Sequence, residues 1–164
     1  MSDFKALLTW FNSKYDFLLW AGPSLLYDQS HEDIINQLRS PNYNSLILKS
    51  TMESNCQHPC AFGQFQLVRT QLHLARLAVN PEYRNKGLLK VLIRSLYLEA
   101  KQMNKIEEIT LFVFRSNTIA FKAYQGLGFK RRSAPKSFVL PEDCEFLVLD
   151  NLFDKDWLSV NVSG

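Results

Sequence analysis

The stretch Leu74-Ala-Arg-Leu-Ala-Val-Asn-Pro-Glu-Tyr-Arg-Asn-Lys-Gly-Leu-Leu-Lys90 decides the fold. An apolar, strand-like run ends at Asn80, a turn follows from Pro81, and a helical pattern begins at Gly87. The first N–H groups of a helix have no partner within the helix, and the helix dipole adds positive potential there. A pyrophosphate is a natural ligand for such a site.

Glycine and basic residues support the interpretation of this turn as a phosphate site. Gly87 lacks the Cβ that would obstruct the approach of a ligand to the backbone. Three basic side chains, Arg84, Lys86 and Lys90, place positive charge around the same turn. Taken alone, the turn also fits a plain strand–turn–helix connection with solvated basic residues, so a second motif has to decide.

The second motif is Asn117-Thr-Ile-Ala-Phe-Lys-Ala-Tyr-Gln-Gly-Leu-Gly-Phe129. Asn117 is a good N-cap, and Ala120 and Tyr124 fall on one face of the helix that follows. Two glycines near the end of the motif can terminate that helix in a left-handed turn. Taken alone, Tyr124 is more often a core aromatic than a catalytic residue.

In this order, the two motifs resemble the two signatures of the GNAT superfamily of acyl-CoA N-acyltransferases. Residues 77–87 resemble its acetyl-CoA signature, Arg/Gln-x-x-Gly-x-Gly/Ala, although Leu89 replaces the final small residue. Residues 117–129 resemble the second signature, in which an Asn begins a helix that carries a Tyr, and Gly-Phe opens the next strand. The chain therefore looks like a bacterial-type single-domain N-acetyltransferase.

The order of the expected elements indicates a mixed α/β sheet rather than a doubly wound one. Helices are expected in the N-terminal third, including one from His31 to Leu38 with Ser30 as its N-cap. The later elements are expected at Ser45–Met52, Ala61–Thr70 and Leu72–Asn80 (strands), Gly87–Met103 (helix), Glu108–Phe114 (strand), Thr118–Gln125 (helix), and Gly128–Arg132 and Glu145–Leu149 (strands). The resemblance implies the GNAT acyltransferase fold over one domain, residues 1–164. In that α+β fold a mixed, mostly antiparallel central sheet is flanked by helices, with a V-shaped splay between the fourth and fifth family strands, here 72–80 and 108–114.

The resemblance also implies which residues bind acetyl-CoA. The backbone of Leu77, Ala78 and Val79 would pair with the pantetheine arm as an added strand does. The amides around the turn would hold the pyrophosphate, and Asn117 would contact the cofactor arm. The expected pyrophosphate-binding residues are Arg84, Asn85, Lys86, Gly87, Leu88, Leu89 and Lys90.

The catalytic roles follow from direct attack of a neutral amine on the thioester. This reaction needs a base for the amine, donors for the developing oxyanion and an acid for the leaving thiolate. Tyr124 matches the family's acid position, and a backbone N–H near Val79 is the expected oxyanion donor. The family's usual base is missing at two of the positions where relatives carry a Glu, because Ala75 and Phe112 occupy them.

His73 is the candidate base. Its reference pKa of about 6.5 suits the task. Strand alternation puts His73, Ala75 and Leu77 on one face of the expected strand. Two alternatives stay open: His73 is a surface or hydrogen-bonded strand histidine, or ordered water carries the proton away.

We therefore expect an acetyl-CoA-dependent N-acetyltransferase acting on a primary amine of a small molecule or peptide. The runner-up acceptor is a protein N-terminus or lysine, and the alternative of a different class is a catalytically silent CoA-binding protein. The acceptor is expected to lie against residues 4–38 and 134–143. Trp10, Trp20 and Tyr27 make the first of these segments aromatic, so a polyamine is a poor first guess.

Composition sets the outer limits. Hydrophobic residues make up 46% and charged residues 21% of 164 residues, as in ordinary globular domains. A net charge of +3 is too small to indicate nucleic-acid binding. No membrane span or secretory signal is recognisable, which predicts a cytoplasmic protein. The sequence leaves open whether two copies form a homodimer.

Cysteine and histidine give no strong metal signal. Three cysteines, an odd number, suit a reducing compartment with free thiols. Cys56, His58 and Cys60 do not have a usual zinc spacing. The expectation is a hairpin turn at His58-Pro59 and no metal.

Overall fold

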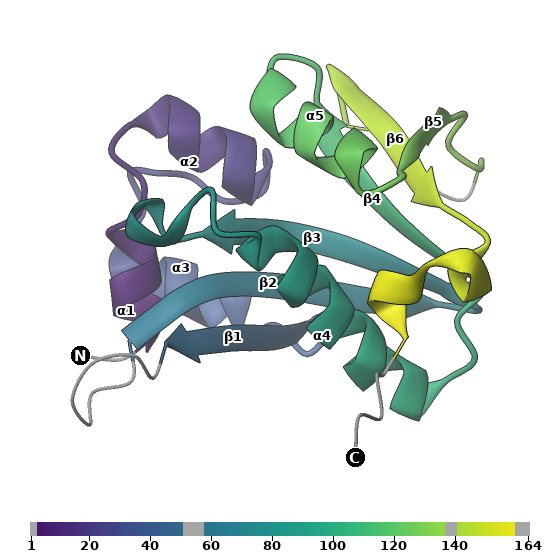
Figure 1. Ribbon diagram of the computed structural model, residues 1–164. Helices are drawn as coiled ribbons and strands as arrows, with labels where there is room; N and C mark the ends of the chain where they lie inside the picture. The colour runs from purple at the N-terminus through teal and green to yellow at the C-terminus, as the bar shows by residue number, and fades with distance from the viewer. Residues whose placement is uncertain (1–2, 51–57, 137–140, 160–164) are drawn as a thin grey trace.

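The computed structural model describes residues 3–50, 58–136 and 141–159, and it has a six-stranded sheet in the order β1-β2-β3-β4-β6-β5 (Figure 1). The strands are β1 (Asn44–Ser50), β2 (His58–Val68), β3 (Gln71–Val79), β4 (Glu108–Phe114), β5 (Lys130–Arg132) and β6 (Cys144–Leu149). The helices are α1 (Asp3–Leu8), α2 (Lys14–Ala21), α3 (His31–Leu38), α4 (Leu88–Met103) and α5 (Thr118–Gly126), with short 3₁₀ turns at Pro81–Tyr83, Leu152–Asp154 and Asp156–Leu158. The predicted mixed and mostly antiparallel sheet, flanked by helices, is confirmed.

The sheet opens in its middle. All neighbouring strands pair antiparallel except β3 and β4, which are parallel. Their register runs only from Gln71↔Glu108 to Leu74↔Leu111. Beyond these positions β3 continues along β2 to Val79, and β4 continues along β6 to Phe114. The predicted V-shaped splay is therefore present between these two strands.

Two apolar clusters lie on opposite faces of the sheet. The larger contains Leu92 and Leu96 of α4, Tyr124 of α5 and Leu72 and Leu74 of β3. The smaller joins α1, α2 and α3 to Phe62 of β2. Figure 1 shows α4 crossing in front of β2, while α3 lies behind the strands and α1 and α2 lie at the left of the view.

A β-bulge interrupts β3 and changes which side chains share a face. Phe62 pairs with Ala78 and Gln64 with Ala75, so Arg76 and Leu77 together oppose Gly63. Arg76 adopts a left-handed backbone with φ of 50°. The extra residue moves Leu77 to the α4 face, where a Cβ on Gly63 would lie 2.9 Å from Leu77 Cδ2. The expectation that His73, Ala75 and Leu77 share one face is wrong, because strand alternation does not continue through a bulge.

Two predicted helix caps are confirmed. The Ser30 hydroxyl accepts a hydrogen bond from the Asp33 N–H at 3.1 Å and donates to the Asp33 carboxylate at 2.6 Å. Asn117 Oδ1 accepts from the Ala120 N–H at 3.2 Å. The side chain that begins each helix thus satisfies one of the amides that the helix leaves unpaired.

The turn predicted at His58-Pro59 is wrong at those residues. Both belong to β2, where Pro59 pairs with Lys49 and His58 with Ser50. The register shifts between Leu48 and Lys49, and such an irregularity accommodates a proline within a strand. Met52, the predicted end of the first strand, and Cys56 lie outside the described residues.

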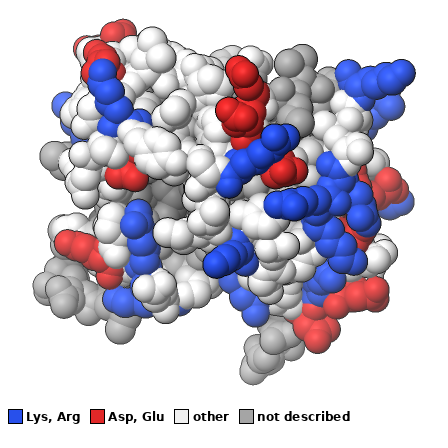
Figure 2. Space-filling model, turned by 90° about the horizontal axis from the view of Figure 1, so that it is seen from above, with Lys and Arg blue, Asp and Glu red and all other residues white. Residues whose placement is uncertain are grey.

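Charged side chains are distributed unevenly over the surface. Figure 2 shows Lys and Arg gathered on the half of the molecule that carries α5, β5 and β6. β5 is wholly basic, with the sequence Lys-Arg-Arg, and all three residues are exposed. Glu145 and Asp150 pair with part of this charge through Arg115, Arg131 and Arg132. The described residues contain no helix that is long and apolar enough to cross a membrane.

Candidate active site

A large cavity of about 600 Å³ occupies the opening between β3 and β4. Its volume lies in the usual range for ligand pockets, about 300–1,000 Å³. It is lined by the second half of β3, the middle of β4, the starts of α4 and α5, and the N-terminal helices. Of the residues predicted from the two motifs, it brings together Leu77, Ala78, Val79, Arg84, Asn85, Gly87, Leu88, Leu89, Asn117 and Tyr124.

The turn before α4 presents backbone amides to this cavity. Asn85 and Gly87 both have left-handed backbones, with φ of 60° and 74°. Gly87 is the N-cap of α4, and its carbonyl accepts hydrogen bonds from the N–H groups of Lys90 and Val91. The amides of residues 87–89 precede the first intrahelical bond and are available to an anion. This is the arrangement that the first motif predicts for a phosphate.

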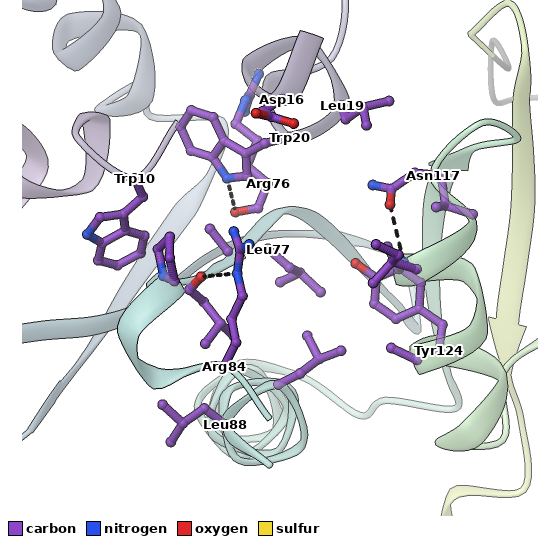
Figure 3. A pocket seen from close by; sticks show the side chains of 18 of the residues that line it. Trp10, Asp16, Leu19, Trp20, Arg76, Leu77, Arg84, Leu88, Asn117 and Tyr124 are labelled. Atoms are coloured by element: carbon purple, nitrogen blue, oxygen red, sulfur yellow. Dashed lines mark hydrogen bonds between the residues drawn. The ribbon is translucent and has the colours of Figure 1, made fainter. Parts of the chain in front are cut away.

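Two of the three predicted basic residues lie away from the large cavity. Lys86 Nζ lies over the Tyr83 ring, 5.1 Å from its centroid, and Lys90 Nζ lies 6.0 Å from the Trp157 centroid. Neither lysine lines the cavity, whereas Arg84 does. Arg84 Nε donates to the Val79 carbonyl at 3.4 Å, so its guanidinium is held against the end of β3 (Figure 3).

Within the described part of the chain, no strand pairs with the edge of β3 that faces β4 beyond Leu74. Side chains reach the strand there. Trp20 Nε1 donates to the Arg76 carbonyl at 2.8 Å, and Arg84 holds the Val79 carbonyl. An open strand edge is what an extended ligand such as a pantetheine arm pairs with.

Tyr124 reaches the same cavity from α5. Its ring packs edge-on against Phe129 at 5.8 Å, and only 8% of the residue is exposed. Figure 3 shows its hydroxyl directed into the cavity toward Leu77. Burial raises the pKa of this hydroxyl above its usual range, so the group is protonated at neutral pH.

His73 lies beside a second, smaller cavity. This small cavity measures about 270 Å³ and shares Leu19, Trp20, Leu74, Ala75, Arg76 and Phe112 with the large one. His73 Nδ1 lies 2.9 Å from Thr110 Oγ1, which is on the neighbouring β4. Burial lowers the pKa of His73 to about 4, so the ring is neutral at pH 7. Its role as a base stays a prediction.

The N-terminal segment forms the wall opposite Tyr124, where the sequence predicts the acceptor. Trp10 and Trp20 are buried and line the large cavity. Trp20 stacks on Phe11 with centroids 4.4 Å apart. Tyr27 lines neither cavity and packs instead against Phe17.

Sequence reasoning missed two charged residues of the site, Asp16 and Arg76. Both line the large cavity, and Arg76 also lines the small one. Asp16 follows Ser13, whose hydroxyl donates to its carboxylate at 2.8 Å. A signal for Arg76 was present, because it is a single charge within the otherwise apolar run 74–79.

The family model for acetyltransferases of the GNAT family matches residues 5–129. The chain belongs to the acetyltransferase (GNAT) family. The match includes both motifs, β3, α2 and α3, so the family predicted from the motifs is confirmed.

A curated relative of this GNAT chain is the spermidine N(1)-acetyltransferase of Thermoplasma acidophilum, which is 30% identical over 106 residues. That alignment covers 62% of this chain and 62% of the relative's length.

Solved structures share the fold at lower identity. The PaiA N-acetyltransferase of Thermoplasma acidophilum in complex with coenzyme A has a TM-score of 0.62 at 20% identity, covering 90% of this chain and 92% of that one. The spermidine N-acetyltransferase of Vibrio cholerae in complex with CoA and spermine has a TM-score of 0.67 at 14% identity, covering 96% and 93%.

Metal ligands are not grouped in the described part of the chain, where no three His, Cys, Asp or Glu residues cluster. Cys60 and Cys144 are buried free thiols. Burial raises the pKa of both thiols, which makes them poor nucleophiles.

Proposed function

We propose that this GNAT protein transfers the acetyl group of acetyl-CoA to a primary amine of a small molecule or peptide, by direct attack in a ternary complex. One observation carries the proposal. The large cavity brings together the amides at the start of α4, the open edge of β3 and the hydroxyl of Tyr124. These are an anion site, a site for an extended chain and a proton donor in one cavity.

The described residues fit acetyl-CoA as a substrate. The turn at Asn85–Gly87 offers amides to the pyrophosphate, and Leu77, Ala78 and Val79 offer a strand edge to the pantetheine arm. Asn117 caps α5 and lines the cavity, which supports its proposed contact with the arm. Leu89, in place of a small residue, lines the cavity and packs against the core cluster while its amide remains at the helix start.

The proposed reaction also requires two proton transfers. As the new C–N bond forms and the C–S bond breaks, the amine loses a proton and the departing thiolate gains one. Tyr124 is the proposed donor to the thiolate, because its hydroxyl is protonated and faces the cavity. A backbone N–H near Val79 is the proposed donor to the developing oxyanion.

The proton of the amine leaves by His73 or by water. His73 is neutral at pH 7 and reaches the small cavity, which adjoins the large one through six shared residues. With a pKa of about 4, His73 is a weak base. It can accept the proton during the attack only if the amine is already mostly neutral in the site.

The test is acetyl transfer by the purified full chain. Acetyl-CoA is supplied with amino acids, aminoglycosides, polyamines, short peptides and an intact protein mixture. Thiol release measures turnover, and mass spectrometry identifies the acetylated product. Turnover of only the protein mixture would assign the chain to protein N-termini or lysines, while tight CoA binding without any acetylated product would make it a silent CoA-binding protein.

A further inference from the structure

Arg76 occupies a constrained place between the two cavities. It forms the bulge of β3 with a left-handed backbone, a conformation that costs a non-glycine residue roughly 1–2 kcal/mol. Its carbonyl accepts the Trp20 Nε1–H bond that holds α2 to the sheet. The residue lines both cavities. The strained residue therefore lies where the two cavities meet, and its guanidinium lies beside Ser24 and Tyr43 of the small cavity.

The groups that hold the guanidinium are neutral among the residues that the structure describes. Nη1 donates to Gln64 Oε1 at 2.8 Å and Nη2 donates to Ser24 Oγ at 3.3 Å, while the guanidinium lies 5.0 Å from the centroid of the Tyr43 ring. Gln64 is fully buried and cannot turn away, because its Nε2 donates to the Leu38 carbonyl at 2.6 Å and to Ser45 Oγ at 2.8 Å. The arginine is thus fixed from behind by a network that carries no charge.

No carboxylate of the described residues balances this cation. None of the ion pairs among them includes Arg76. Its Nε is buried and has no hydrogen-bond partner in that part of the chain. The single acidic residue among those lining either cavity is Asp16, which accepts from Ser13 at the start of α2. A desolvated charge without a counterion is costly, so a ligand anion at this point would bind favourably.

We propose that Arg76 binds a carboxylate of the acceptor, so that the preferred acceptors are small amines that also carry a carboxylate, such as amino acids. This inference rests on the proposed acetyl transfer and names its substrate class. Arginine binds carboxylates through paired, charge-assisted hydrogen bonds. The small cavity, about 270 Å³, suits a compact acceptor.

The same charge bears on the amine. A nearby cation lowers the pKa of an amine and favours the neutral form, which is the form that attacks the thioester. A polyamine, with several positive charges and no carboxylate, meets repulsion from Arg76 without compensation. The positive charge therefore favours carboxylate-bearing amines over polyamines in binding.

Matched acceptor pairs test the proposal with the full chain. Each pair consists of an amino acid and the amine that lacks only its carboxylate. The pairs cover apolar, aromatic and cationic side chains, and spermidine is tested separately. We expect kcat/KM to be about 10- to 100-fold higher for the amino acid of a favoured pair, since a hydrogen-bonded charge contributes about that much. Arg76→Gln should remove this preference mainly through KM, and Arg76→Lys should restore part of it.

Controls separate binding from structure. Arg39→Gln makes the same charge change at an exposed arginine that lines neither cavity, and it should leave the preference intact. Thermal stability and CoA affinity are measured for every variant. If Arg76→Gln does not fold, the acceptor pairs with the wild type and Arg76→Lys still decide.

Three results would overturn the proposal. The first is that the wild type acetylates the carboxylate-free amines or spermidine as well as the amino acids. The second is that Arg76→Gln lowers kcat/KM equally for both members of a pair, which assigns Arg76 a purely structural role. The third is that no amine of any class is acetylated, and that result rejects the proposed acetyl transfer itself. The first two leave acetyl transfer standing.

Discussion

Tyr124 and His73 are both buried, and burial acts on them in opposite senses. It raises the pKa of the Tyr124 hydroxyl, which keeps a proton on a potential acid. It lowers the pKa of His73, which keeps the imidazole neutral but weakens it as a base. In each case the low-polarity surroundings favour the uncharged form.

Removal of the Tyr124 hydroxyl tests its role as the acid. Tyr124→Phe keeps the ring that packs on Phe129 and deletes the proton donor. We expect kcat to fall on the order of 10²–10⁴-fold, the usual range for loss of a positioned acid, with little change in CoA affinity or Tm. Tyr97→Phe is the matched control, because Tyr97 is equally buried in α4 but lines neither cavity. Full activity of Tyr124→Phe would assign Tyr124 to the core.

The lowered pKa of His73 predicts that the free energy of unfolding falls in acid. Because its folded pKa of about 4 lies below the unfolded value of 6.5, the unfolded state binds more protons between these pH values. The contribution of His73 to the free energy of unfolding is complete above pH 6.5. It falls by about 3 kcal/mol as the pH drops to 4. Urea unfolding at several pH values should show this fall in the wild type and a smaller one in His73→Gln.

The same substitution separates the two roles of His73. His31→Gln, at an exposed histidine at the start of α3, serves as its control. If His73 is the base, the acid limb of the kcat/KM profile should lie near pH 4 rather than 6.5 and disappear in His73→Gln. An unchanged profile with a changed stability curve means that the histidine only joins β3 to Thr110.

At the scale of elements, the turn into α4 can be tested with two glycines. Gly87 has a left-handed φ of 74°, whereas Gly126 has no such requirement, and neither would bring a Cβ within 4 Å of another atom. Gly87→Ala should therefore strain the backbone, cost about 1–2 kcal/mol and weaken CoA binding. Gly126→Ala should raise stability by about 0.5–1 kcal/mol and leave CoA binding unchanged. Calorimetric titration and urea unfolding measure both; equal CoA affinity in the two variants would contradict the phosphate-binding role of the turn.

The elements themselves could be predicted from the sequence because each carries a local signal. Hydrophobic spacing and caps such as Ser30 and Asn117 mark the helices, and the turn at Pro81–Gly87 marks the site. The bulge at Arg76 has no such signal, because no glycine stands at its left-handed position. The site therefore differs from prediction at the face of Leu77, where strand alternation was assumed to continue through the bulge.

At the scale of the whole molecule, CoA should stabilise the fold. The large cavity contacts the N-terminal helices, both halves of the sheet, α4 and α5, so a ligand within it binds the folded state alone. CoA at about 100 times its Kd should add roughly 2.7 kcal/mol to the free energy of unfolding. Pantetheine, which lacks the pyrophosphate, is the control and should add less at equal concentration. Identical unfolding curves with and without saturating CoA would count against the cavity as a CoA site.

The short pairing between β3 and β4 has a consequence for how the molecule moves. It joins two three-stranded halves of the sheet at four residue pairs, reinforced by the side-chain contacts Gln71 to Glu108 and His73 to Thr110. Amide hydrogens at such a narrow join exchange with solvent through local opening, at lower free energy than global unfolding. A substrate bound across both halves would hold them together. We therefore expect the acetyl donor to slow amide hydrogen exchange in β3 and β4 together, while the exchange rates of helices far from this pairing stay unchanged.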